Sequence, residues 1–186
     1  MNALLSLWLP ILLSAVVVFI LSSLVHMVFK WHNPDYKGFA NEDAVRAAIN
    51  AGNPAPGQYV LPYCTDMKDM ASEAMTKKYQ EGPVGFLRLN APGPVNMGKS
   101  LGIWFLFTLV VTTVAAYLAW RICGLDPAQG LRAGKWGAAI AFIAFGFGTV
   151  PESIWLGRPW ISTAKYLLDA ALYGLGVGAV FWWLWP

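Results

Sequence analysis

The first apolar stretch of the chain, residues 3–29, reads ALLSLWLPILLSAVVVFILSSLVHMVF and contains no Asp, Glu, Lys or Arg. A helix needs about 20 apolar residues to cross a bilayer core of roughly 30 Å, and this stretch exceeds that length. It has no basic residue ahead of it and no small-residue cleavage site behind it, so it differs from a secretory signal. We therefore expect a retained membrane span within residues 1–29.

Three further apolar stretches follow, at residues 100–122, 136–157 and 162–185. Of the 186 residues, 57% are hydrophobic and 12% are charged, a balance that soluble domains of this size do not show. Tryptophans gather near the ends of the stretches, as is typical of the two membrane interfaces. The sequence predicts an all-α integral membrane protein with four transmembrane helices.

Most of the charge lies between the first and second stretches, in residues 30–99, which hold eight of the thirteen basic and seven of the ten acidic residues. We expect this segment to be an extramembrane cap that packs on the bundle, because it is short and rich in Pro and Gly. Its patterns predict two short helices, at 42–50 and 67–81, and two short strands, at 58–61 and 84–89, that could pair.

The charges of the short loops bear on the orientation. Arg121, Arg132 and Lys135 lie around the second loop, whereas Arg158 and Lys165 lie around the third. The positive-inside rule then places both termini in the cytoplasm and the cap outside. Counting the charges that flank the cap would reverse this assignment, so both orientations stay open.

Ionisable residues inside the predicted spans gather at one depth. His26, Glu152 and Asp169 each lie within about 10 Å of the cap-side end of a span, at 1.5 Å of rise per residue. Arg158 and Lys165 follow as nearby counter-charges. Such groups are costly in lipid and are candidate functional sites. Two interpretations stay open: ion pairs that hold the bundle and cap together, including a Lys165–Asp169 pair four residues apart, or a ligand, proton or ion site.

Small residues recur at helical spacing in the third and fourth stretches, where membrane helices could approach closely. The predicted packing residues are Ala141, Ala144, Gly148, Ala170, Gly174 and Gly178. Since Glu152 continues the stripe of the third stretch, we expect it to face a neighbouring helix.

No cofactor is predicted, but two alternatives remain. With His26 and His32 as its only histidines, both at one end of one stretch, the chain does not suit a haem held by two histidines. A single axial His26 for a haem or another pigment stays open. Cys64, Met67 and Met70 are soft ligands that suit Cu(I), although the same spacing is typical of an apolar helix face. Cys64 and Cys123 are too few for a disulfide framework.

Familiar hydrolase, nucleotide-binding and zinc signatures are absent from the sequence. A net charge of +3 gives no reason to expect nucleic acid. We therefore expect a non-enzymatic protein of the lipid bilayer, a structural or accessory subunit that contacts other membrane subunits or further copies of itself. The alternative is a homo-oligomeric transporter, or an ion- or proton-conducting protein, that uses His26, Glu152 and Asp169 as its polar site.

Overall fold

The computed structural model describes residues 2–186, with side chains from Leu4 onward, and these residues form two compact units. The first unit contains residues 2–35, 96–153 and 158–186, which include the long apolar helices. The second contains residues 36–95 and 154–157, with the short helices and the strands.

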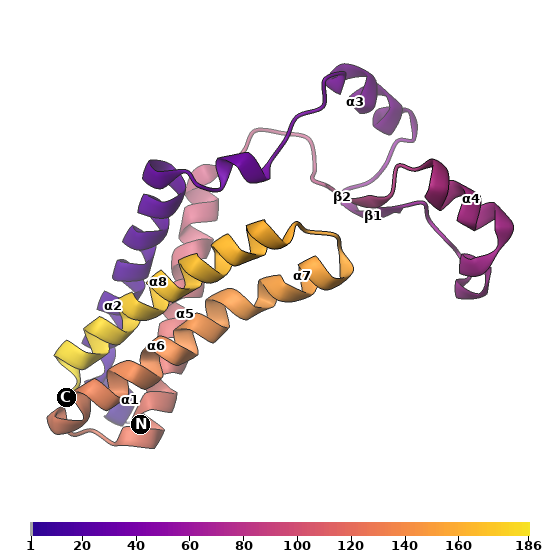
Figure 1. Cartoon of the computed structure of the whole chain (residues 1–186). Coiled ribbons are helices and arrows are strands. Elements are labelled where there is room, and N and C mark those ends of the chain that lie inside the picture. Colours follow the sequence, from indigo (N-terminus) through magenta and orange to yellow (C-terminus); the bar gives the residue numbers. More distant parts are fainter. Residues whose placement is uncertain (1) are drawn as a thin grey trace. The chain divides into compact units, whose positions relative to one another are not determined.

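The first unit is a bundle of four helical segments (Figure 1). In it, α2 contacts α5 and α8, and α6 also contacts α5 and α8, so the segments close into a ring. The elements are α1 (Asn2–Ser6), α2 (Trp8–Ser23), the π-helix η1 (Leu24–Phe29), α5 (Met97–Cys123), α6 (Gly130–Gly146), α7 (Val150–Trp155) and α8 (Trp160–Leu184), with the 3₁₀ turns η2 (Asn33–Asp35), η4 (Pro127–Gln129) and η5 (Phe147–Thr149). The last two residues of α7 belong to the second unit.

Within residues 2–186, four helical stretches are long and apolar enough to cross a membrane, which is compatible with a multi-pass membrane protein. They are Trp8–Phe29, Met97–Cys123, Pro127–Trp155 and Trp160–Leu184. The third begins well before the predicted residue 136, because the Asp126 side chain accepts a hydrogen bond from the Ala128 N–H and caps the first turn. Arg132 and Lys135, which made this part resemble a loop, are exposed side chains of α6.

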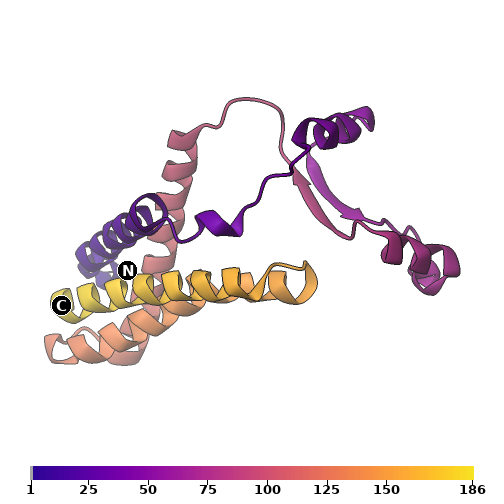
Figure 2. The ribbon, with the colours of Figure 1, turned by 45° about the horizontal axis from the view of Figure 1, so that its top comes forward.

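The closest helix pair is α6 and α8, which run side by side in opposite directions (Figures 1 and 2). A Cβ on Gly134 would lie 2.6 Å from the carbonyl oxygen of Gly178, and a Cβ on Gly178 would lie 2.8 Å from that of Gly134. A Cβ on Gly174 would likewise lie 2.7 Å from the carbonyl oxygen of Ala138. The two backbones are therefore in contact, as small residues permit in membrane helices.

The predicted packing stripe of the third stretch differs from the observed one. Ala141 is buried, but Ala144 and Gly148 are exposed, and a Cβ on Gly148 would meet no heavy atom within 4 Å. In α8, Ala170, Gly174 and Gly178 are all buried. Ala144 precedes η5, so that turn does not account for its exposure. Beyond Ala141 the contact with α8 passes to Gly146, which is buried and where a Cβ would lie 2.9 Å from the Ala170 Cβ.

The second unit is built around an antiparallel pair of strands, β1 (Gly57–Leu61) and β2 (Gly85–Leu89), with Tyr59 opposite Leu87. It also contains α3 (Glu42–Ala51), the 3₁₀ helix η3 (Met67–Ala71) and α4 (Glu73–Glu81). The helix predicted over 67–81 is thus divided at Ser72, whose extended backbone ends η3 and whose hydroxyl caps α4 by accepting from the Met75 N–H.

Candidate functional site

The segment that follows the first long helix folds back onto α8. The π-helix η1 ends at Lys30, which adopts a left-handed conformation with φ of 53° and donates its N–H to the Val25 carbonyl. The chain then turns through η2, where the Asp35 N–H bonds the His32 carbonyl. These turns carry Trp31, His32 and Asp35 to the first half of α8. Single π-turns within helices are frequent at functional sites.

Asp169 is the centre of a hydrogen-bonded network with this segment. The side chain of Asp169 is 3% exposed, and Trp31 donates its Nε1–H to Asp169 Oδ1 at 3.0 Å. His32 Nε2 lies 2.7 Å from Asp169 Oδ2, and His32 Nδ1 lies 3.0 Å from Asp35 Oδ2. A single imidazole therefore bridges two carboxylates that lie far apart in the sequence.

Lys165 completes the network at Asp35. Its Nζ donates to Asp35 Oδ1 at 2.5 Å and to the Trp31 carbonyl at 2.7 Å. The hydrogen bond from Lys165, with a smaller contribution from His32, holds the pKa of Asp35 below its ordinary value. The stability that this carboxylate contributes is thus present at neutral pH, and it is lost as the pH falls through the lowered pKa.

Aromatic contacts join the remaining residues to the network. The His26 ring stacks on the His32 ring with centroids 5.0 Å apart, and the Tyr166 ring lies 4.5 Å from His32 on centroids. The Arg158 guanidinium lies 4.7 Å from the Tyr166 ring centre and pairs with Glu152 at 3.0 Å. All five ionisable residues singled out in the sequence therefore belong to one connected group.

The pairing inside this group differs from the sequence-based expectation in one respect. One of the two open interpretations paired Lys165 with Asp169 along one helix, but the ammonium binds Asp35 and the Asp169 carboxylate binds Trp31 and His32. Both charges of α8 therefore hold the segment that follows η1, which the interpretation of a helix-surface pair did not include.

A cavity of about 690 Å³ opens beside this network, within the first unit. We call it the polar cavity. Its volume lies within the range of small-molecule sites, and it combines an aromatic and aliphatic wall with a few polar groups. It is lined by Ser22, Ser23, His26, Met27, Met97, Ser100, Leu101, Trp104, Phe145, Thr149, Tyr166, Asp169 and Tyr173. Trp104 donates its Nε1–H to the Ser22 hydroxyl, which orients the indole in the wall.

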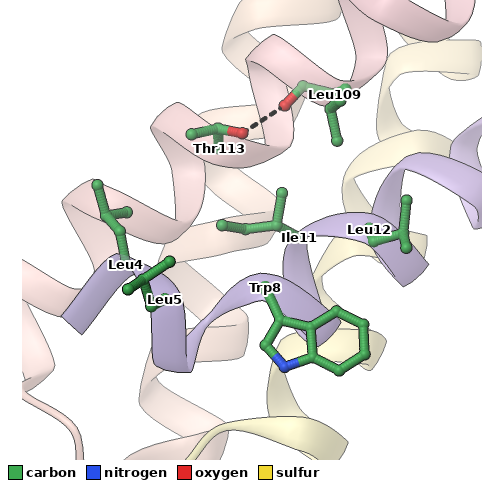
Figure 3. A pocket seen from close by; sticks show the side chains of 7 residues that line it. All are labelled: Leu4, Leu5, Trp8, Ile11, Leu12, Leu109 and Thr113. Atoms are coloured by element: carbon green, nitrogen blue, oxygen red, sulfur yellow. Dashed lines mark hydrogen bonds between the residues drawn. The ribbon is translucent and has the colours of Figure 1, made fainter. Parts of the chain in front are cut away.

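A second hollow, of about 610 Å³, lies between the N-terminal helices and α5 and has a different character (Figure 3). Its lining is aliphatic apart from Trp8 and Thr113, and the Thr113 hydroxyl already donates to the Leu109 carbonyl of its own helix. None of the described residues that line it carries a charge that could orient a ligand. We therefore place the candidate site in the polar cavity.

Three residues that form the network were missed as site residues in the sequence. Trp31 reads as an interfacial tryptophan, and His32 and Asp35 read as the polar start of a loop. The available signal was the spacing of His32 and Asp35 directly after a span, since residues three apart across a tight turn can share a hydrogen bond. Nothing in that spacing identifies Asp169 as the partner of His32.

The copper alternative assumed that Cys64, Met67 and Met70 lie on one helix, and they do not. Cys64 lies before η3, so it does not share a helix face with Met67 and Met70. Its thiol donates to the Asp66 carbonyl at 2.9 Å, and Met67 is 76% exposed. The three sulfurs are therefore not aligned in the way that the spacing suggested.

No protein-family model matches the chain, and comparisons with curated proteins and with solved structures found no match. The functional argument consequently rests on the geometry of this site.

Proposed function

We propose that this chain is a four-span membrane protein that binds a small amphipathic molecule in the polar cavity of its helix bundle. The observation that carries the proposal is the position of His26 and Asp169 at a largely apolar cavity between helices long enough to cross a bilayer. An apolar cavity with a few convergent polar groups is the general form of a small-molecule site. Ionisable groups within membrane-spanning helices are expected to serve binding or transport.

The chemistry of the lining indicates the type of ligand. Trp104, Phe145 and Tyr173 supply aromatic surface for an apolar body. His26, which is exposed at the cavity, and the hydroxyls of Ser22 and Ser100 supply hydrogen-bonding groups for a polar head. The ligand that fits is therefore a molecule with one polar end and an apolar remainder.

A cavity-filling substitution tests this proposal. Leu101 lines the polar cavity and is 40% exposed, whereas Leu118, on the same helix, is 39% exposed and does not line it. The protein is extracted gently from native membranes into nanodiscs, and small molecules that it retains are measured by native mass spectrometry. We expect a retained molecule in the wild type and in Leu118→Trp, and its loss in Leu101→Trp. Equal retention by all three proteins, or none by the wild type, would contradict the proposal.

Proton transfer is a second candidate, favoured by the continuous hydrogen-bonded series Asp35–His32–Asp169. Histidine and carboxylate series of this kind carry protons in membrane proteins. In liposomes that contain a pH-sensitive dye, the wild type should pass protons and Asp169→Asn should not. Glu152→Gln is the matched control, because Glu152 binds Arg158 at the border of the group. An impermeable wild type would contradict this candidate.

The sequence-based hypothesis of an accessory subunit stays a prediction, as does that of a homo-oligomer. Gentle extraction followed by mass spectrometry of the intact particle tests both. Foreign subunits in fixed ratio would support the first, and several copies of this chain alone would support the second.

A further inference from the structure

Three potential metal ligands lie together at the wall of the polar cavity. His26, His32 and Asp169 each offer one nitrogen or oxygen, and these three atoms all lie within 4.8 Å of one another. Two imidazoles and one carboxylate are a ligand set that suits first-row divalent metals such as Zn²⁺ and Fe²⁺. The residues come from η1, from the turn after it and from α8, so the fold assembles the set.

His32 is oriented as metal-binding histidines commonly are, because one of its nitrogens faces the other ligands and the other faces the carboxylate of Asp35. Its Nδ1 faces Asp35 and its Nε2 faces Asp169. Because a neutral imidazole has only one N–H, both nitrogens can face carboxylates only if a proton or another cation occupies the second position. An Nδ1–H directed to Asp35 leaves the Nε2 lone pair pointing at Asp169. Metal-binding histidines are typically oriented in this way by a carboxylate.

Asp169 is held in a similar manner. Trp31 donates to Oδ1, which leaves Oδ2 directed toward His32. A tetrahedral ion with bonds of about 2.0–2.2 Å separates its ligands by roughly 3.4 Å. The present 2.7 Å between His32 Nε2 and Asp169 Oδ2 would therefore have to widen by roughly 0.7 Å.

The local charge favours a cation between these atoms. Asp35 and Asp169 bring two carboxylates, and Lys165 neutralises the first of them. When His32 is neutral, the donors that the described residues present to the Asp169 carboxylate are all neutral. Burial of that charge is costly without a counter-ion, which a divalent metal ion supplies.

His26 provides the third ligand and relates the ion to the cavity. Its ring stacks on His32, and both His26 and Asp169 line the polar cavity. Three protein ligands leave a coordination position vacant, as in catalytic rather than structural zinc sites. We infer that His26, His32 and Asp169 bind a divalent transition-metal ion that keeps an open position facing the polar cavity. This inference does not rest on the amphipathic ligand, since the ion and the ligand can be measured separately.

Cobalt binding tests the inference, because Co²⁺ replaces Zn²⁺ in such ligand sets and absorbs visible light. The full chain carries a tag without histidine, has Cys64 and Cys123 changed to Ser, and is stripped with chelator and placed in nanodiscs. Titration with Co²⁺ should show one saturable site per chain, and added Zn²⁺ should abolish its absorption. Asp35→Asn should lower the affinity for Co²⁺ by about 10–100-fold, the usual effect of removing a group that orients a metal ligand.

The decisive variant is His26→Gln, because this exposed side chain can be replaced with little disturbance of packing. This variant should lower the affinity for Co²⁺ by about 100-fold or more, and so should Asp169→Asn. Met27→Leu is the matched control: Met27 is next in the chain, lines the same cavity and is also exposed, and its substitution should leave the affinity unchanged. Absence of a saturable site in the wild type, or unchanged affinity in His26→Gln, would overturn the inference.

Discussion

Lys165 binds the carboxylate of Asp35, which is distant in the sequence, and not that of Asp169 on its own helix. Its sequence spacing from Asp169 is that of an intrahelical pair, and such a pair is worth only about 0.2–0.5 kcal/mol. Asp35, with a side chain 7% exposed, offers a stronger interaction because its charge is buried and has, among the residues that the structure describes, His32 as its one other side-chain partner. A contact across 130 positions of the chain leaves no periodic signal in the sequence.

We predict that Lys165→Met lowers the free energy of unfolding by about 2 kcal/mol, because it leaves the Asp35 charge with one hydrogen-bond partner fewer. The measurement is thermal unfolding in nanodiscs. In an Asp35→Asn background the same substitution should cost much less, since the two residues act as a pair. An equal cost in both backgrounds would show that Lys165 acts elsewhere.

At the scale of elements, the existence of the long helices and the packing face of α8 were predictable, but the packing face at the end of α6 was not. Ala144 and Gly148 continue the stripe of Gly130, Gly134, Gly137 and Ala141 at steps of three and four, so the sequence pattern alone extends the packing face to them. Burial departs from this stripe after Ala141 and passes to Gly146, and the turn η5 then changes the helical phase before α7 begins. The network around Asp169 has a similar origin, because the π-helix η1 redirects the chain and a 3.6-residue period cannot describe that change.

We predict that Gly134→Ala lowers the free energy of unfolding by about 1–3 kcal/mol, because the new methyl group would meet the Gly178 carbonyl of α8. The matched control is Gly102→Ala in α5, where a Cβ would meet no heavy atom within 4 Å. This control should leave stability unchanged or raise it by up to about 1 kcal/mol. Thermal unfolding of the three proteins in nanodiscs compares them, and similar melting temperatures for Gly134→Ala and the wild type would argue against backbone contact between α6 and α8.

For the whole molecule, composition and length predicted the four long helices, and turn residues predicted the strand pair between the first two. Both predictions depend on residues that are close together in the sequence, so they could be made without knowledge of the tertiary structure. The residues of the candidate site were singled out in part: the sequence pointed to His26, Glu152, Arg158, Lys165 and Asp169 by their depth in the predicted spans. Their partners in the turn after η1 and the aromatic contacts through Tyr166 depend on how distant segments pack, and one sequence does not contain that information.

The claim on which the others depend is that four helices cross the membrane, and the two cysteines allow a direct test. Cys64 lies in the second unit and Cys123 is the last residue of α5, so one predicted crossing separates them. The single-cysteine variants Cys123→Ser and Cys64→Ser are exposed to a small membrane-impermeant thiol reagent in intact and in permeabilised cells.

We predict that the two cysteines label from opposite sides. If both termini are cytoplasmic, Cys64 labels in intact cells and Cys123 labels only after permeabilisation. The reverse order would retain the four spans and invert the orientation. Labelling of both cysteines from the same side would contradict the account, because α5 would then not cross the membrane.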